Sequence, residues 1–109
     1  MSRRFEDVFE EAMDRGLSIL GNVTREVILY FMNRNYGIGK GSMGSNILKV
    51  HEALVDILGD GARFVERSIV SALCELVGLP SITVRGKDFL TAIEYIRRIY
   101  EDKFPCSSI

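Results

Sequence analysis

Hydrophobic side chains recur at helical spacing along most of this chain, with polar side chains between them. In the first segment the apolar positions follow one another at helical spacing, namely Phe5, Val8, Phe9, Ala12 and Met13. This spacing predicts an amphipathic helix that buries a single stripe. Acidic side chains fill its opposite face at positions 6, 7, 10, 11 and 14. We expect this acidic face to be solvated, and the alternative is an acidic docking surface for a basic partner.

The second segment, residues 23–36, contains six consecutive apolar residues, VILYFM at 27–32. Polar residues on both sides extend it beyond strand length, so we predict a helix with Asn22 as its N-cap rather than a central strand. A helix that is apolar around most of its circumference must be buried on several sides. The sequence therefore places it either at the centre of a bundle or at a subunit interface. The candidate interface residues are Val27, Ile28, Tyr30 and Phe31.

Two further helices are predicted close together, over residues 46–58 and 61–77. The first takes Ser45 as its N-cap and turns these apolar side chains inward: Ile47, Val50, Leu54, Ile57 and Leu58. Between the helices, the sequence GDG at 59–61 supplies a glycine to end one helix and Asp60 to cap the next. Gly78 and Pro80 end the second helix. We therefore predict a tight αα-hairpin over residues 46–78.

The C-terminal third contains one short alternating segment and one helix. Residues 81–86, SITVRG, alternate briefly between polar and apolar side chains, which is compatible with an extended segment and leaves open whether they form a strand. Asp88 can cap a final helix from Phe89 to about Lys103. Its apolar side comprises Phe89, Ala92, Ile93, Ile96, Ile99 and Tyr100. Together the segments predict an all-α, single-domain bundle of about five helices over residues 1–109, with flexible ends at 1–3 and 104–109.

Composition supports one globular domain and narrows the function classes. The 109 residues are 47% hydrophobic and 27% charged, and the formal net charge is −1. Basic residues are scattered, so the electrostatic footprint of a nucleic-acid-binding protein is missing. The N-terminus is charged, and no apolar run reaches the roughly 18 residues of a membrane span, so we expect a soluble, cytoplasmic protein without membrane contact. Glutamine is absent, a bias reported for thermophiles.

The stretch YGIGKGSMGSN, residues 36–46, contains four glycines just before a predicted helix. It matches G-x-G-x-x-G, but a helix rather than a strand precedes it, and it departs from a P-loop because Gly41 follows Lys40. We therefore predict a connector in which Gly37 ends the preceding helix and Ile38 folds back towards Met32. The alternative is an anion site at the start of the next helix, formed by Lys40, Ser42 and Ser45.

Other residues with reactive side chains do not form a recognisable catalytic or metal site. His51 is the only histidine, and Cys74 and Cys106 lack the spacing of zinc ligands. We expect Cys74 to be a buried apolar residue and Cys106 a free thiol, with an intracellular disulfide as the alternative. Acidic pairs such as Glu66 with Glu75 and Glu52 with Asp56 occur on most helices. The sequence therefore predicts no enzyme, no cofactor and no metal.

The last third has a mild excess of basic side chains: Arg85, Lys87, Arg97, Arg98 and Lys103. Acidic residues in the same segment nearly cancel this charge. We expect a solvated face, and the alternative is contact with the phosphates of RNA or another ligand.

Two stretches, residues 25–38 and 51–79, together resemble a small archaeal family described as a Nitrosopumilus-type signal-output domain. In that family an apolar helix ends in Tyr-Gly-Ile, and an Ala-Leu helix runs through Gly-x-Gly-Ala into a second helix. The matching residues are Tyr36, Gly37, Ile38, Ala53, Leu54, Gly59, Gly61, Ala62, Glu66, Ile69 and Leu73. The resemblance covers about half the chain and carries no catalytic residue. The glycine-rich segment 39–44 and the residues beyond Pro80 depart from the family pattern.

The sequence thus predicts a non-catalytic interaction or signal-output module of an archaeal cytosolic protein, which acts as a homodimer and binds another protein. The alternative is a nucleic-acid-binding or regulatory protein in which one of the last helices meets phosphates. An enzyme that uses the loop at 37–45 is the third hypothesis.

Overall fold

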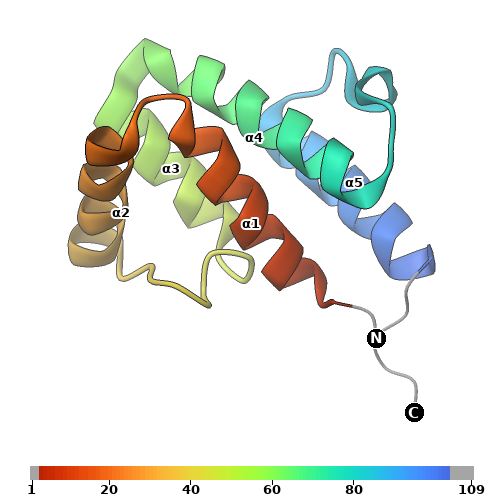
Figure 1. Ribbon diagram of the computed structural model, residues 1–109, viewed down its shortest axis with the longest axis horizontal. Coiled ribbons are helices and arrows are strands. Elements are labelled where there is room, and N and C mark those ends of the chain that lie inside the picture. Colours follow the sequence, from red (N-terminus) through yellow and green to blue (C-terminus); the bar gives the residue numbers. More distant parts are fainter. Residues whose placement is uncertain (1–2, 104–109) are drawn as a thin grey trace.

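The computed structural model describes residues 3–103, which form a compact, all-helical globule with a radius of gyration of 13.5 Å (Figure 1). Its α-helices are α1 (Phe5–Ser18), α2 (Asn22–Tyr36), α3 (Ile47–Leu58), α4 (Ala62–Val77) and α5 (Phe89–Lys103). Two short 3₁₀ helices, η1 (Gly59–Gly61) and η2 (Ser81–Val84), connect the later helices. The all-α prediction is confirmed, and no strand occurs between residues 3 and 103.

Helix α1 supplies the centre of the hydrophobic core. Its five predicted apolar residues are all buried, and its main packing partner is α4 (Figure 1). The two helices approach very closely at Gly16, where an added Cβ would lie 2.4 Å from Cγ1 of Ile69 and 2.9 Å from its backbone. Only glycine fits this crossing, so the spacing of α1 and α4 depends on one residue.

The acidic face of α1 is mostly bound to groups of the same chain. Glu6 pairs with Arg97 at 3.0 Å, and Glu11 pairs with Arg3 at 2.6 Å and with Arg15 at 2.9 Å. Asp14 pairs with Arg25, and Glu10 accepts hydrogen bonds from backbone amides of the glycine-rich loop. These carboxylates connect α1 to its neighbours, so the prediction of a merely solvated face was incomplete.

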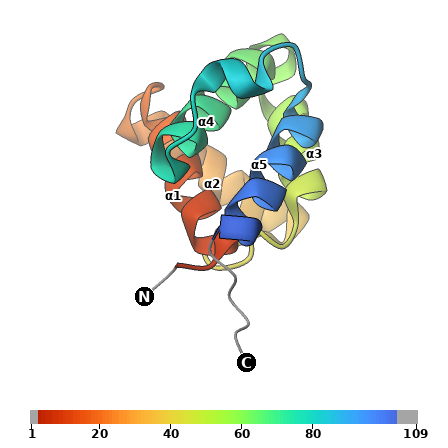
Figure 2. The ribbon, with the colours of Figure 1, turned by 90° about the vertical axis from the view of Figure 1, so that its right-hand side faces the viewer.

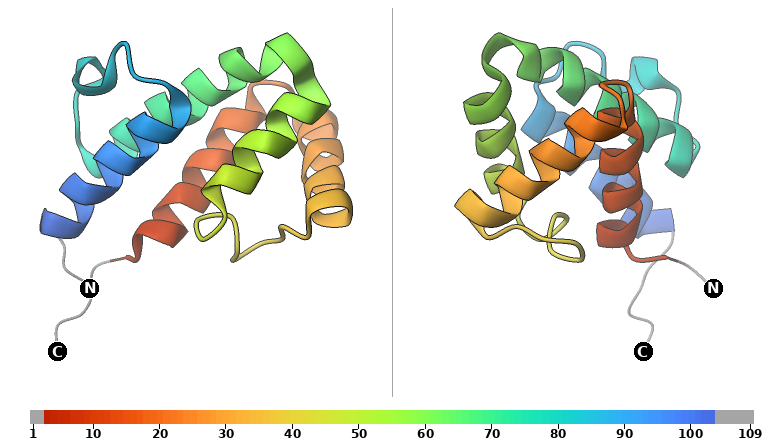
Figure 3. Two further views of the ribbon diagram at one scale, coloured as in Figure 1. Left: turned by 180° about the vertical axis from the view of Figure 1, so that it is seen from behind. Right: turned by 60° about the vertical axis from the view of Figure 1, so that its left-hand side comes forward.

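Helix α2 lies at the edge of the molecule, and it packs against α1 and α3 through one side only (Figure 3). Ile28 and Met32 are buried, whereas Val27, Tyr30 and Phe31 are 46%, 58% and 41% exposed. Of the two predicted placements, the centre of the bundle is therefore wrong, and the subunit interface stays a prediction. The apolar run combines an inward stripe with a separate outward stripe on the same helix.

The ends of α2 follow the sequence prediction in part. Gly37 adopts a left-handed conformation, with φ of 67°, and its N–H donates to the Asn33 carbonyl. The Ile38 N–H donates to the Met32 carbonyl at 3.2 Å, as expected for a glycine-terminated helix. At the other end, Asn22 is the first helical residue and Gly21 is the N-cap, so the predicted cap was wrong by one position.

Helices α3 and α4 meet at a corner and diverge from it (Figure 3). The N-cap of α3 is Asn46 rather than Ser45, and the Asn46 side-chain amide donates to the Ser42 carbonyl at 2.8 Å. Asp60 lies within η1, so Gly61 is the N-cap of α4. The two helices of the predicted hairpin thus follow each other along the chain. They do not pack mainly on each other, because the main partner of α4 is α1.

Residues 81–84 form η2, so the extended conformation that the sequence left open is not adopted. The Pro80 carbonyl accepts from the Thr83 N–H at 3.0 Å, and the Ile82 carbonyl accepts from the Arg85 N–H at 3.2 Å. An isolated strand of this length would have no neighbouring strand to bond, whereas a 3₁₀ turn satisfies these backbone groups locally. The cap of α5 is as predicted, because the Asp88 carboxylate accepts from the Thr91 N–H at 2.8 Å.

The predicted flexible ends lie largely outside the described residues, which begin at Arg3 and end at Lys103. Arg3 itself is held to the globule, because its guanidinium bonds Glu11 and its carbonyl accepts from the Tyr100 hydroxyl.

Candidate functional site

A pocket of about 880 Å³ lies beside α4, between that helix, the segment around η2 and the start of α5. Helices α4 and α5 lie side by side, and the segment with η2 joins them (Figure 2). Its lining includes apolar side chains from three elements: Val70 of α4, Val84 of η2 and Ala92 of α5. The volume is within the range of roughly 300–1,000 Å³ typical of small-molecule sites.

Three helices each contribute one side chain to the floor of this pocket: His51 from α3, Glu66 from α4 and Phe89 from α5. Nδ1 of His51 and Oε2 of Glu66 are hydrogen-bonded. The Phe89 ring stacks on the imidazole, with ring centroids 5.9 Å apart and planes inclined by 21°. The imidazole is therefore held on two sides, by a carboxylate and by an aromatic ring.

Glu66 is the only charged residue that is buried within the described part of the chain. Burial raises the pKa of its carboxyl, because removal from water disfavours the ionised form, while the hydrogen bond from His51 opposes this effect. A buried carboxyl needs a partner, and His51 is the partner that the fold supplies.

Cationic side chains surround the mouth of the pocket: Arg63 and Arg67 from α4, and Arg85 and Lys87 from the segment before α5. None of these arginines has a carboxylate within 4.0 Å among residues 3–103. Lys87 lies over the Tyr95 ring, 5.0 Å from its centroid. We call this site, with its His51–Glu66 floor, the basic pocket.

Two carboxylates face the same pocket, and each has a partner. Glu66 bonds His51, and Asp88 accepts from the Thr91 amide. Hydrogen bonding from the Thr91 side chain and then from its backbone amide lowers the pKa of Asp88. The cations of the rim therefore outnumber the carboxylates, so the pocket carries a positive excess.

The predicted C-terminal basic face is divided by the fold. Arg97 bonds Glu6 at 3.0 Å and Glu101 at 3.1 Å, and Arg98 bonds Glu94 at 3.4 Å. Arg85 and Lys87 instead join the basic pocket. The α5 arginines are thus paired within the chain.

The glycine-rich loop binds a carboxylate of its own chain. Glu10 accepts hydrogen bonds from the backbone N–H of Gly41 and, at 3.4 Å, from that of Met43. Gly44 packs on Glu6, where an added Cβ would lie 2.6 Å from Cα. The loop is therefore fixed against α1, with Met43 buried beneath it.

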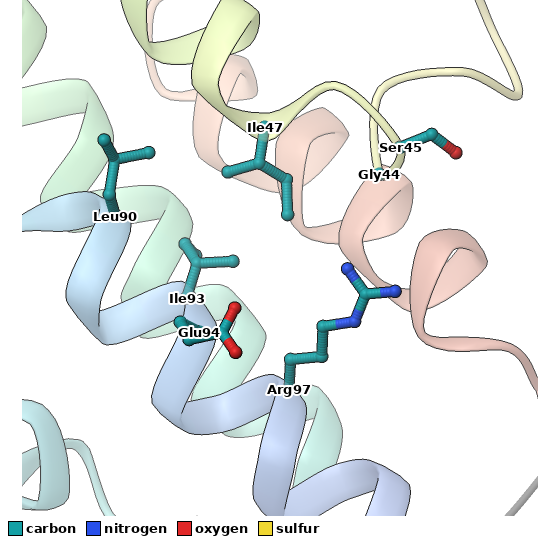
Figure 4. Close-up of a pocket in the computed structure, with 7 residues that line it drawn as sticks. All are labelled: Gly44, Ser45, Ile47, Leu90, Ile93, Glu94 and Arg97. Carbon is teal, nitrogen blue, oxygen red and sulfur yellow. The ribbon is translucent and has the colours of Figure 1, made fainter.

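Of the three residues of the predicted anion site, Lys40 and Ser42 line neither the basic pocket nor the small pocket that Ser45 borders. Lys40 is exposed, and the Ser42 hydroxyl bonds the Gly39 backbone at 3.0 Å. Ser45 borders a small pocket of about 240 Å³ between this loop and α5, with its hydroxyl turned away from Leu90 and Ile93 (Figure 4). Binding of an anion by this loop stays a prediction.

The second surface of interest is the outer face of α2, formed by Val23, Val27, Tyr30 and Phe31, which we call the α2 face. Val23 is 79% exposed, and the four side chains recur at helical spacing on one stripe. Ile28, predicted to belong to this surface, is instead 1% exposed in the core. The sequence prediction therefore included one residue of the inner stripe and omitted Val23.

Metal and thiol chemistry have no assembled site in the described part of the chain. Residues 3–103 contain no group of three or more side chains able to hold a metal ion. Cys74 is buried with a free thiol, and burial raises its pKa. Cys106 lies outside the described residues. No helix within 3–103 is long and apolar enough to cross a membrane.

Comparisons of the chain with protein-family models, with curated proteins and with solved structures found no match. The resemblance to the Nitrosopumilus-type signal-output domain therefore stays a prediction.

The sequence analysis did not find the His51–Glu66 pair, because the two residues are fifteen positions apart on different helices. One signal was present: Glu66 directly follows buried Val65 and precedes buried Ile69 by three positions. A carboxylate beside an apolar stripe can be buried with it, and a buried carboxylate needs a hydrogen-bonding partner. The position of Glu66 could therefore have identified it as a candidate site residue.

Proposed function

We propose that the chain is a non-catalytic interaction or signal-output module that self-associates through the α2 face. The observation that supports this proposal is the outward stripe of Val23, Val27, Tyr30 and Phe31 on a helix already packed by its other side. Contiguous exposed apolar surface of this kind typically marks a protein interface. The resemblance to an archaeal signal-output family suggests an archaeal cytosolic protein that passes a signal to a further protein.

A second copy of the chain suits this surface because its charges are self-complementary. Glu26 and Arg34 lie towards opposite ends of α2: the Glu26 side chain is 69% exposed and pairs with Arg25 at 3.4 Å, and Arg34 donates to the Tyr30 hydroxyl at 3.3 Å. Two copies of α2 packed antiparallel about a two-fold axis would bring Val27 of one near Phe31 of the other. The same arrangement puts Glu26 within side-chain reach of Arg34 of the second copy, twice per dimer.

The experiment is sedimentation velocity across a hundredfold concentration range. We expect the wild type to show a monomer–dimer equilibrium and Phe31→Glu to remain monomeric, because a buried unpaired carboxylate disfavours the interface. Phe64→Glu is the matched control, since Phe64 is 63% exposed on α4, outside the α2 face. A wild-type monomer at all concentrations, or equal effects of both substitutions, would contradict the proposal.

A charge exchange tests the antiparallel geometry separately. We expect Glu26→Arg to weaken association, because two like charges then face each other, and Arg34→Glu in the same chain to restore it. If the double variant does not recover self-association while Phe31→Glu remains monomeric, the α2 face is still the interface but the antiparallel orientation is wrong.

A further inference from the structure

We propose that the basic pocket binds a small organic phosphate, with the arginines of its rim on the phosphate group and its apolar lining residues against the organic part. This site is separate from the α2 face, and the proposal does not depend on self-association.

The charge of the rim is the first argument for an anionic ligand. Arg63 and Arg67 project from α4, and Arg85 lies on the opposite side of the pocket, in the segment before α5. Among residues 3–103 none of the three forms an ion pair, although most other arginines of this range do. Arginine presents several N–H donors in a planar fork that fits phosphate oxygens. Unpaired guanidinium groups around one cavity are therefore suited to an anion.

The size and lining of the pocket define the rest of the ligand. A volume of about 880 Å³ is far more than a single phosphate ion requires. The lining residues Val70, Val84 and Ala92 offer apolar contact in addition to the cationic side chains. A ligand with one phosphate and an apolar or aromatic body matches both parts, since small-molecule sites combine apolar area with a few placed polar groups.

The carboxylate that is buried in the pocket has a partner, so it repels such a ligand only weakly. Glu66 is 7% exposed and bonds His51, which in turn stacks on Phe89. The negative charge of Glu66 is thus partnered on the floor, while the cations stand at the mouth. A nucleic-acid strand is less suited than a small ligand, because it would extend beyond the pocket and require further cations for its phosphates. The nearby arginines of α5 are paired with carboxylates.

Calorimetric titration of the full chain tests the proposal with three probes: inorganic phosphate, adenosine monophosphate and adenosine. We expect the monophosphate to bind, inorganic phosphate to bind at least tenfold more weakly, and adenosine not to bind at millimolar concentration. The backbone amide signals of Arg85 and Phe89 should shift during the monophosphate titration. No binding of any probe, or equal binding of adenosine and its monophosphate, would overturn the proposal.

Variants connect the binding to the rim. We expect Arg63→Ala with Arg67→Ala to weaken monophosphate binding at least tenfold, and Arg85→Ala to weaken it several-fold. Arg98→Ala is the control, because Arg98 is highly exposed on α5 outside the pocket and should leave binding unchanged. These side chains are at the surface, so an unchanged thermal unfolding midpoint shows that the fold is retained. Equal losses for Arg98→Ala and the pocket variants would overturn the assignment.

Titration with a short single-stranded oligonucleotide tests whether the pocket binds nucleic acid instead. If it binds with a steep salt dependence while adenosine monophosphate does not bind, the pocket belongs to a nucleic-acid interface and the proposal fails.

Discussion

Individual residues decide how closely the helices of this protein approach and what the basic pocket contains. Gly16 allows α1 to contact the backbone of α4 at Ile69, and Glu66 gives His51 a fixed partner. The sequence correctly predicted the apolar stripe from Phe5 to Met13, which precedes Gly16. It could not reveal that Gly16 faces another backbone, because the partner is more than fifty positions away.

Replacement of Gly16 tests the close approach. Gly16→Ala adds a Cβ that overlaps Ile69, so we expect a loss of about 1–3 kcal/mol in the free energy of unfolding. Gly61→Ala is the control, since φ at Gly61 is −69° and the nearest atom to an added Cβ is 3.9 Å away. That change should be neutral or stabilising by about 0.4–1 kcal/mol. Urea unfolding measures both values, and equal effects would contradict the account.

Glu66 makes a pH-dependent contribution to stability. Because burial raises its pKa in the folded chain above the ordinary value of about 4.5, the folded state retains a proton that the unfolded state has released. Stability from this group is therefore fully present at lower pH and falls as the pH rises through the folded-state pKa. Glu66→Gln removes this titration and keeps an acceptor for His51.

We accordingly expect the Glu66→Gln variant to gain stability relative to the wild type as the pH rises above about 4.5, and the gain to level off above the folded-state pKa. Urea unfolding between pH 4 and pH 8 provides the measurement. A difference that stays constant over this range, or that shrinks as the pH rises, would show that burial does not dominate at Glu66.

At the scale of the elements, helices were predictable wherever one apolar stripe alternated with one polar face. Helix α5 has its predicted cap at Asp88 and buries all but Ile99 of its predicted stripe. One segment has a conformation other than the one its pattern suggested. The alternation of residues 81–86 suggested an extended segment, but the local turn after Pro80 determines their conformation.

Helix α2 shows why a run of apolar residues is ambiguous. Six consecutive apolar positions occupy both sides of a helix, and the sequence does not distinguish a buried second side from an exposed one. Ile28 and Met32 pack in the core, whereas the α2 face lies outside. The two stripes should therefore differ in what they contribute: the inner one to the stability of the monomer, and the outer one to association.

Alanine substitutions separate the two stripes. Ile28 is 1% exposed, so Ile28→Ala should cost about 2–5 kcal/mol through lost contacts and a cavity. Val27 is 46% exposed, so Val27→Ala should change the free energy of unfolding by less than about 0.5 kcal/mol. Both are measured by urea unfolding at concentrations below those of self-association. Similar losses would mean that α2 is buried on both sides within one chain.

At the scale of the whole molecule, contacts between distant positions assemble the fold and could not be inferred from one sequence. The Tyr100 hydroxyl bonds the Arg3 carbonyl, Arg97 bonds Glu6, and Glu10 bonds the glycine-rich loop. Such pairs join segments that no periodicity connects. The basic pocket arises in the same way, from residues of α3, α4 and the segment before α5.

The two surfaces occupy different parts of the molecule, and α3 lies between them. His51 on α3 borders the basic pocket, while Asp56 on the same helix accepts from the Tyr36 hydroxyl of α2 at 2.7 Å. Helix α3 is therefore in contact with both the pocket and the helix that carries the α2 face. A module that takes a ligand at one surface and a second copy at the other would have this arrangement.

The most direct test of the central claim is an intermolecular nuclear Overhauser measurement on a mixture of isotope-labelled and unlabelled chains. The account predicts cross-peaks from the Phe31 ring of one chain to the Val27 methyl groups of another, because an antiparallel pair of α2 helices brings them together. A spectrum without intermolecular contacts from the α2 face, at concentrations where the protein is dimeric or at the highest attainable, would contradict it.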